Sequence, residues 1–573
     1  MAIHNADVAA EFNRVADLLE IEGANPFRVR AYRRAAQTIE DLPTSLARMV
    51  EEGADLATLP GIGADLAGKI RDICMSGHSG ALDEIEARTP STLAALTSVP
   101  GLGPRRVHQL HEKLGITSLD ELKAAAVAGK LRALPRFGEA LEKKIIAELR
   151  KGEPAEHRFK IATAEDFASG LVTHLEAGPG IGRIVVAGSF RRRKDTVGDL
   201  DILVTASDGK AAIDHFVAYP EVARVISQGT TRATVLLKAG LQVDVRVVPE
   251  ESYGAALHYS TGSKPNNIAV RRIAQEKGLK LNEYGIFRGN ARIGGATEDE
   301  VFAMAGLPYI EPELREDRGE IEAAAEGRLP RLITLADIKG DLHVHTRQSD
   351  GKSTLEEMAA AARALGYAYV AVTDHSQHAT VAHGLDPERL SAELDAIDRL
   401  NEKLVGITIL KSAEVDILAD GTLDLPDDML ARLDLVVAAV HYRFDLDPEA
   451  QTDRIIRAMD NPHFNILAHP TGRLLGERPG YPVDLEKVMH AASERGCFLE
   501  VNAHRSRLDL DDIACHAAKA LGVGLVISTD AHSTFGLRAM RHGVDQARRG
   551  WIEASDVLNT RPLPELRKRL RRR

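Results

Sequence analysis

The sequence predicts a multidomain α and α/β protein with an all-helical N-terminal region, a mixed α/β centre and a C-terminal distorted (β/α)7 barrel. Three observations support this fold class. Residues 1 to 150 show dense helical periodicity. Short apolar strands that carry aspartates follow in the centre. Beyond residue 337, seven apolar stretches alternate with mostly helical patterns, which is typical of a parallel barrel.

The composition indicates an ordinary globular protein of several domains. A chain of 573 residues with 44% apolar and 27% charged residues has room for three or four domains. Its three separated cysteines predict a reducing compartment without disulfides. The N-terminal stretch does not resemble a signal peptide, and no run is long enough to span a bilayer, so we expect a cytoplasmic protein with no membrane partner.

The net charge of −11 does not exclude a nucleic-acid partner. The average includes carboxylates that metal ions would neutralise. Residues 181–290 alone contain 16 Lys and Arg against 11 Asp and Glu. The centre of the chain is therefore locally basic.

Three similar turns recur in the helical region: LPGIG at 59–63, VPGLG at 99–103 and LPRFG at 134–138. Each precedes an amphipathic helical pattern. A glycine turn that opens a helix presents free backbone amides to a phosphate oxygen. Such loops also join helices for purely structural reasons, but three in one segment favour DNA binding. The third turn has Arg136 in place of a glycine, so the candidate DNA-binding glycines are Gly61, Gly63, Gly101 and Gly103.

Three aspartates in the centre predict a metal site. Asp199 and Asp201 lie two residues apart in a predicted strand and so share one face. Asp244 lies on the polar face of a second strand, whose other face carries alternating valines. Close carboxylates repel one another unless a divalent cation lies between them. Three acids on adjacent strands suit two-metal phosphoryl transfer.

A turn at Gly188-Ser189 precedes these acids and is followed by Arg191, Arg192 and Arg193. Backbone amides and guanidinium groups in this order suit a triphosphate. A solvated surface hairpin is the alternative interpretation of an isolated Asp-x-Asp. The turn and the third aspartate together favour catalysis.

The seven strand-like stretches of the C-terminal region end mostly in His, Asp or Glu. Functional residues of such barrels lie at the carboxyl ends of the strands. Nine nitrogen and oxygen ligands meeting there would hold about three divalent ions. The candidate ligands are His343, His345, Asp350, His375, Glu414, His441, His469, Asp530 and His532.

Each segment resembles part of a known family. The central strands resemble the nucleotidyltransferase palm of family X DNA polymerases, and the glycine turns resemble helix-hairpin-helix motifs. The C-terminal region resembles the polymerase and histidinol phosphatase (PHP) domain. The resemblance implies a lyase-like DNA-binding domain at 1–85, a fingers-like domain at 86–153, a palm at 154–250, a thumb at 251–318 and a PHP domain at 337–573. The residues from 308 to 338 are charged and include three prolines, which predicts a linker, here bounded at 319–336.

The polymerase resemblance also implies residue roles. Asp199 and Asp201 would ligate two Mg²⁺ or Mn²⁺ ions, and Asp244 the ion nearer the primer 3′-OH. Arg271 would contact the template strand. Ser260 stands where many members have Phe, which puts the exclusion of ribonucleotides in doubt. The implied nucleotide-binding residues are Gly188, Ser189, Arg192, Gly198, Tyr259, Gly262 and Asn267.

Two further activities follow from the resemblance. Lys69 matches the Schiff-base lysine of members with 5′-deoxyribose-phosphate lyase activity, and neighbouring arginines would lower its pKa. Asp65 occupies the position of a second lysine in the lyases, so this activity stays open. Complete barrel ligands imply metal-dependent 3′→5′ exonuclease action with Mn²⁺ or Zn²⁺.

The sequence therefore predicts a DNA polymerase that fills short gaps in repair and processes 3′ ends. Its partners would be gapped or primed double-stranded DNA and dNTPs, and we expect a monomer associated with the nucleoid. Two alternatives stay open. One is a PHP phosphoesterase tethered to DNA by a nucleotidyltransferase-like module, and the other is a non-catalytic scaffold at DNA ends.

Overall fold

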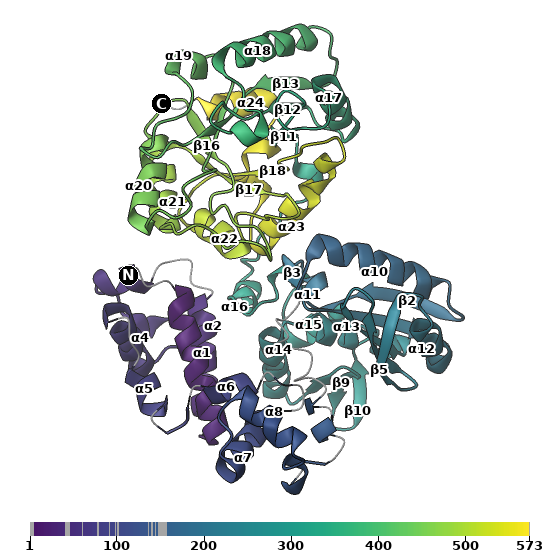
Figure 1. The fold of residues 1–573 in the computed structure, drawn as a ribbon. Coiled ribbons are helices and arrows are strands. Elements are labelled where there is room, and N and C mark those ends of the chain that lie inside the picture. The colour runs from purple at the N-terminus through teal and green to yellow at the C-terminus, as the bar shows by residue number, and fades with distance from the viewer. Residues whose placement is uncertain are drawn as a thin grey trace. The chain divides into compact units, whose positions relative to one another are not determined.

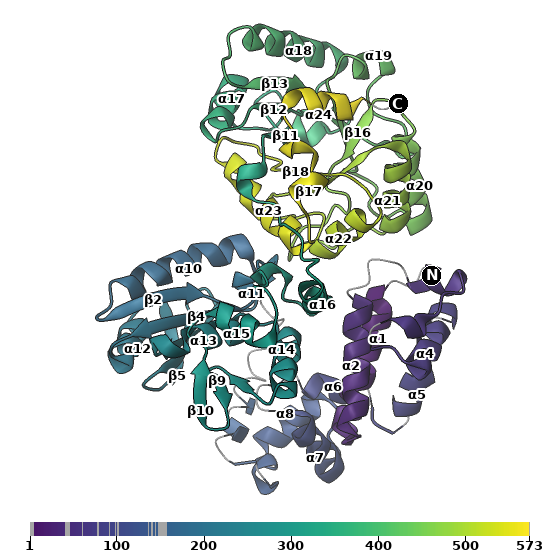
Figure 2. The same cartoon turned by 180° about the vertical axis from the view of Figure 1, so that it is seen from behind.

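The computed structural model describes residues 5–40, 46–59, 61–76, 80–86, 88–90, 92–97, 99, 102–135, 137–138, 141–143, 145–146 and 158–571. The chain divides into two compact units, residues 1–156 and 157–573. Figures 1 and 2 show the helical first unit, and the sheets and barrel of the second, from opposite sides.

The first unit is all helical in its described part. A long hairpin of two helices packs Phe12 against Tyr32, with ring centroids 5.4 Å apart. Two helices confirm those expected after the first two glycine turns, whereas Gly101 and much of the third repeat lie outside the described residues. The helices are α1 (Asn5–Glu22), α2 (Pro26–Glu40), α3 (Leu46–Glu51), α4 (Ala64–Ser76), α5 (Gly80–Glu86), α6 (Thr92–Leu96), α7 (Pro104–Leu114) and α8 (Leu119–Val127).

The second unit begins with a five-stranded sheet in the order β2-β4-β7-β6-β5. Its central pair, β4 and β7, is parallel, and the other neighbours are antiparallel. Valines of β7 face the core on alternate positions, as the sequence predicts. The elements are β1 (Phe159–Lys160), α10 (Ile161–Glu176), β2 (Ile181–Val186), α11 (Gly188–Arg191), β3 (Thr196–Val197), β4 (Asp199–Ala206), α12 (Gly209–Val217), β5 (Val222–Gln228), β6 (Arg232–Leu237) and β7 (Gln242–Val248).

A smaller helical body with a three-stranded antiparallel sheet follows, in the strand order β10-β9-β8. Its core includes Ala324 and Leu332, so the segment expected as a linker packs against this body and contains a helix of its own. The elements are α13 (Tyr253–Thr261), α14 (Lys264–Glu276), β8 (Lys280–Asn282), β9 (Gly285–Arg288), β10 (Ala291–Gly294), α15 (Glu298–Ala305) and α16 (Glu320–Ala325).

The C-terminal region alternates parallel strands with helices. The stretch expected as one strand at 408–415 is split into two, β13 and β14. The strands form sheets of order β11-β12-β13 and β14-β15-β16-β17-β18. Parallel bridges from His375 to Glu414 and from Val344 to Ala531 join the two sheets, which is consistent with the expected barrel. Its strands are β11 (Gly340–Val344), β12 (Tyr369–Val372), β13 (Thr408–Lys411), β14 (Glu414–Asp416), β15 (Val436–Ala439), β16 (Phe464–Leu467), β17 (Phe498–Asn502) and β18 (Leu525–Ser528).

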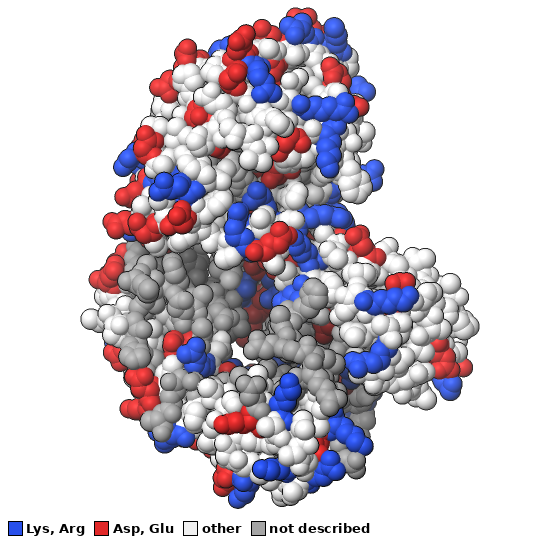
Figure 3. All heavy atoms as spheres, viewed as in Figure 1, with Lys and Arg blue, Asp and Glu red and all other residues white. Residues whose placement is uncertain are grey.

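The barrel helices cover the strands and pack the largest core of the chain. They are α17 (Leu355–Ala364), α18 (Pro387–Asn401), α19 (Asp427–Leu430), α20 (Pro448–Met459), α21 (Leu485–Arg495), α22 (Asp512–Ala520), α23 (Met540–Arg549) and α24 (Leu563–Leu570). Acidic and basic side chains are interspersed over the barrel surface in Figure 3, so that face has no single charge sign. None of the helices within the described residues combines the length and apolar character that crossing a membrane requires.

The barrel packs directly against the sheet that precedes it. Leu475 and Leu508 of the barrel belong to the core of the five-stranded sheet. Trp551, just beyond α23, packs against the apolar cluster of the smaller helical body. Residues 157–573 therefore share continuous apolar contacts.

Candidate active sites and metal centres

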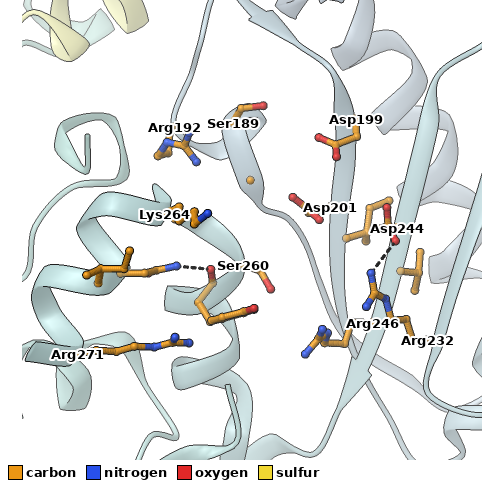
Figure 4. A pocket seen from close by; sticks show the side chains of 17 residues that line it. Ser189, Arg192, Asp199, Asp201, Arg232, Asp244, Arg246, Ser260, Lys264 and Arg271 are labelled. Atoms are coloured by element: carbon orange, nitrogen blue, oxygen red, sulfur yellow. Dashed lines mark hydrogen bonds and ion pairs between the residues drawn. The ribbon is translucent and has the colours of Figure 1, made fainter. Parts of the chain in front are cut away.

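The three central aspartates meet on one face of the sheet. Asp199 and Asp201 begin β4, and Asp244 lies on the adjacent parallel strand β7, where its Cα pairs with that of Asp201. The sequence-predicted juxtaposition is thus present, and Figure 4 shows the three carboxylates along one wall of a cavity. Gly188 packs against the carboxylate of Asp201, since a Cβ on this residue would lie 2.5 Å from Asp201 Oδ2.

The electrostatics of this cluster favour a bound cation. Burial, together with the charges of Asp199 and Asp244, raises the pKa of Asp201 to about 7. Burial and the charge of Asp244 also raise the pKa of Asp199. A carboxylate that resists ionisation next to two others gains strongly from a divalent cation.

A cavity of about 730 Å³ opens over these acids and collects most of the predicted nucleotide-binding residues. Gly198 is not among its lining residues. Three cationic residues that the sequence analysis did not single out also line it: Arg232, Arg246 and Lys264. The predicted residues in its lining are Gly188, Ser189, Arg192, Tyr259, Gly262, Asn267 and Arg271.

The cavity places cations opposite the carboxylates. Arg192, Lys264 and Arg271 lie across from the aspartates in Figure 4. The guanidinium of Arg271 lies 5.1 Å from the ring centroid of Tyr259, and Asn267 Nδ2 donates to the Tyr259 carbonyl at 2.8 Å. The cavity therefore suits a negatively charged ligand whose anionic groups meet the arginines and lysine, with metal ions between the ligand and the carboxylates.

Asp244 is held by its own neighbours. Thr234 Oγ1 donates to it at 2.5 Å, Gln242 Nε2 at 2.9 Å and Arg232 at 3.2 Å. Arg232 is the dashed partner of Asp244 in Figure 4. These bonds fix one rotamer of the carboxylate and leave Asp199 and Asp201 as its more weakly tethered companions.

The barrel brings its predicted ligands together at the carboxyl ends of the strands. Three groups each have ligand atoms within 4.8 Å of one another: His345, Asp350, His375 and His532; His343, His345 and Asp530; His375, Glu414 and His441. His469 Nε2 lies 2.9 Å from Glu414 Oε1 and so completes the nine. Overlapping groups of this kind suit several metal ions with shared ligands.

The donor set fits divalent metal ions. Buried ring nitrogens of His345 and His469 have no hydrogen-bond partner. Although burial opposes it, the imidazoles of His441, His375 and His343 hold the pKa of Glu414 well below its usual range. Unpartnered buried imidazole nitrogens around an ionised carboxylate are the ligands that transition metals and zinc prefer.

The backbone at this site is strained. His469 and Asp530 have positive φ angles of 29° and 54°. Left-handed backbone costs a non-glycine residue about 1 to 3 kcal/mol and persists where surrounding contacts enforce it. Two candidate ligands in this conformation indicate that the barrel mouth is built for their side-chain positions.

Two carboxylates that sequence reasoning missed orient the imidazoles. Glu500 Oε1 lies 2.7 Å from His343 Nδ1, and Asp416 Oδ1 lies 2.5 Å from His441 Nδ1. Carboxylates in this position fix the tautomer and ring plane of a ligating histidine. The clue in the sequence was an acid inside an apolar strand, since a buried carboxylate needs a partner.

The pKa of Lys69 is raised, whereas the sequence analysis expects it to be lowered. Its ammonium group bonds to Asp65 and lies 5.6 Å from the ring centroid of Tyr32. Burial alone would lower its pKa, but the hydrogen bonds to Asp65 and Tyr32 outweigh burial and raise it. The expected lowering by neighbouring arginines is therefore wrong, because Asp65 is the nearer charge.

Comparison with known families agrees with this division into parts. Two families match the first unit: a helix-hairpin-helix domain at 3–79 and a SAM-like helix-hairpin-helix tandem at 93–151. In the second unit, the DNA polymerase beta palm matches 163–274, its thumb 256–316 and the PHP domain 341–504. A nucleotidyltransferase polymerase core and a PHP domain thus occupy one chain.

Individual relatives show which polymerase family the chain belongs to. The "DNA polymerase/3'-5' exonuclease PolX" of Bacillus subtilis is 38% identical over 576 residues and is covered completely, as is this chain. DNA polymerase lambda of Rattus norvegicus is 26% identical over 55% of this chain and 56% of its own length. A "probable phosphatase" of a Thermoanaerobacter species is 33% identical over 38% of this chain and 89% of its own. The chain belongs to the PolX family, the family X DNA polymerases that carry a PHP domain.

Proposed function

We propose that the protein is a DNA-directed DNA polymerase that fills short gaps during repair, with a 3′→5′ exonuclease in its PHP domain. The observation that carries the proposal is the pairing of Asp201 with Asp244 beneath a cation-lined cavity of about 730 Å³. A full-length relative named for both activities supports it.

In the polymerase site, two Mg²⁺ or Mn²⁺ ions would supply charge neutralisation for the primer 3′-OH and the triphosphate. Asp199 and Asp201 would hold both ions, and Asp244 would hold the one nearer the 3′-OH. Ser189 and Arg192, with the turn at Gly188, bind the phosphates. Tyr259, Gly262 and Asn267 would border the sugar and base, and Arg271 would meet the template strand. Gly198 lies outside the cavity lining and would act only through the backbone that leads into Asp199.

In the barrel, the nine ligands would hold about three ions, Mn²⁺ or Zn²⁺, which supply Lewis acidity for cleavage of a phosphodiester. Glu500 and Asp416 keep the imidazoles of His343 and His441 in the tautomer that presents Nε2 to the metal.

In this proposal the first unit binds the DNA backbone. Gly61, Gly63 and Gly103, and by the same sequence pattern Gly101, would bind backbone phosphates of gapped or primed DNA. The proposed domains are 1–85, 86–153, 154–250, 251–318, 319–336 and 337–573. Lyase action by Lys69 stays a secondary proposal, and a monomer at the nucleoid in the cytoplasm is the proposed state.

The test uses a 5′-labelled primer on a one-nucleotide-gapped duplex with Mn²⁺, with and without dNTPs. Wild type is compared with Asp201→Ala and His343→Ala. We expect extension with dNTPs and shortening without them, with each variant losing only its own activity.

Other outcomes decide between the alternatives. If Asp201→Ala still extends the primer, the palm assignment fails. If His343→Ala still shortens it, the nuclease assignment of the barrel fails. Phosphatase substrates would then be tested, since a relative of the barrel is named a probable phosphatase. A scaffold without catalysis would leave strand length unchanged by metal chelation.

A further inference from the structure

The barrel holds the loop that follows the Gly188-Ser189 turn. This loop, residues 191–195, carries Arg192 into the nucleotide cavity and then leads to Asp199. Three of its residues contact the barrel in succession. The pairs are Arg192 O with Arg549 at 2.6 Å, Arg193 Nε with Asp545 at 3.6 Å, and Asp195 with Arg473 at 3.1 Å.

Arg549 makes the contact of this group that reaches the residue nearest the cavity, Arg192. It ends α23, is only 4% exposed, and donates to Asp512 of α22 at 2.5 Å as well as to the carbonyl of Arg192. Figures 1 and 2 both show α22 and α23 on the side of the barrel near α11. The planar guanidinium fork can satisfy several acceptors at once, which an ammonium group cannot do in the same geometry.

The same arginine also reaches the Arg192 side chain through Glu316. Glu316 Oε1 accepts from Arg549 at 3.0 Å and from Arg192 Nε at 3.0 Å. Arg192 NH1 in turn donates to the carbonyl of Thr261 at 2.5 Å. Arg549 therefore fixes Arg192 at two points, its backbone carbonyl and the carboxylate that aligns its guanidinium.

The loop itself needs such support. Arg193 has a φ of 58°, a left-handed conformation that is unfavourable for an arginine. The Arg193 side chain donates a hydrogen bond to Glu165, which also accepts one from Arg541 of the barrel. Strained backbone persists where surrounding contacts over-determine it, and here a large part of those contacts comes from the barrel.

We propose that Arg549 of the PHP barrel is a positioning residue for the polymerase, because it sets the conformation of the loop that presents Arg192 to the nucleotide triphosphate. This inference rests on the proposed polymerase function and adds a dependence of nucleotide affinity on a residue outside the palm. Arg549 contacts neither nucleotide nor metal ligands, and its effect passes through Arg192 and Glu316.

Removal of Arg549 leaves its acidic partners paired. Asp512 keeps Arg318 at 2.9 Å, and Glu316 keeps Arg192. The variant therefore avoids a fully unpaired buried charge, which would be the most destabilising result. Glu316 loses one of its two arginines and the Arg192 carbonyl loses its donor from the barrel, so the loop no longer keeps Arg192 in the orientation that faces the triphosphate.

The experiment is steady-state incorporation on one-nucleotide-gapped DNA by full-length wild type, Arg549→Met and Arg549→Lys. For Arg549→Met we expect the KM for dNTP to rise about tenfold, with kcat changed less than about twofold and the 3′→5′ exonuclease rate unchanged. Arg549→Lys restores the positive charge without the planar guanidinium. Its KM for dNTP should therefore lie between those of wild type and Arg549→Met. A merely structural role would lower the exonuclease rate and the melting temperature together.

The matched control is Glu477→Gln. Glu477 makes another ion pair across the same boundary, with Lys160 at 2.6 Å, but touches neither the loop nor the cavity. Its KM for dNTP should stay at the wild-type value. A rise equal to that of Arg549→Met would overturn the proposal, because any loosening of the boundary would then suffice.

The remaining outcomes also decide the matter. If Arg549→Met melts like wild type and keeps its KM, the inference is wrong although the polymerase function stands. If Arg549→Met does not fold, Arg549→Lys is judged by the same KM criterion, with no change counting against the inference. If wild type itself incorporates no nucleotide, the proposed function fails and the inference fails with it.

Discussion

Replacing Asp201 with Asn should stabilise the metal-free protein while abolishing primer extension. The pKa of Asp201 is raised from its ordinary value of 3.8 to about 7 by burial and by Asp199 and Asp244. A raised carboxyl pKa in the folded state destabilises folding above the unfolded value. The penalty is absent below pH 3.8, grows as the pH rises and is complete above about 7.

The magnitude follows from 1.36 kcal/mol for each unit of pKa difference. The folded protein loses about 2 kcal/mol at pH 5.5 and about 4 kcal/mol at pH 8, as an upper estimate. Asn has the same shape without the charge and relieves this penalty. At about 2 to 4 °C for each kcal/mol, the transition that contains the palm should rise by about 10 °C at pH 8.

Scanning calorimetry in EDTA at pH 5.5 and pH 8 measures this effect, with Asp214→Asn as the control. Asp214 is an acid of the same body that bonds to Lys210 at the surface, and its replacement should change stability by less than about 0.5 kcal/mol. Adding Mg²⁺ should raise the wild-type transition and leave Asp201→Asn nearly unchanged. The reasoning is refuted if Asp201→Asn melts at or below wild type at pH 8 in EDTA.

Three further predictions concern the other sites. Glu500→Gln should weaken metal binding by the barrel about 10- to 100-fold, measured by metal titration of exonuclease activity, while polymerase activity is kept. Gly188→Ala should reduce extension strongly because its Cβ would lie 2.5 Å from Asp201 Oδ2, and unchanged kcat would contradict the packing. Asp65→Asn should lower the pKa of Lys69 and increase borohydride trapping on an abasic site at neutral pH, whereas equal trapping would show that Asp65 does not control the amine.

The palm acids and barrel ligands could be predicted because their positions follow from local periodicity. Asp199 and Asp201 are two apart on a strand, and most candidate barrel ligands end apolar stretches, with Asp350 in the loop after one of them, so strand geometry gathers them at one edge. The sequence predicted that Asp244 lies on an adjacent strand, whereas the exact pairing of Asp201 with Asp244 came from the structure.

Features that depend on distant contacts were missed. Arg549 lies 357 residues from Arg192, and nothing in either local pattern indicates their bond. The segment at 319–336 is expected to be a linker, yet Ala324 and Leu332 are buried against the preceding body. The pKa of Lys69 likewise depends on which of several neighbouring charges is nearest, which the order of residues does not reveal.

Trp551 gives the protein a built-in optical probe. It is the single tryptophan of the chain and packs against the smaller helical body while following the last long helix of the barrel. Its indole also lies 5.5 Å from the ring of His516, a potential quencher. Selective excitation of tryptophan therefore reports on one place only, the contact between the barrel and the smaller helical body. No label is needed, and no other tryptophan contributes to the signal. Stopped-flow traces recorded on mixing with nucleotide or DNA would time any movement at that contact.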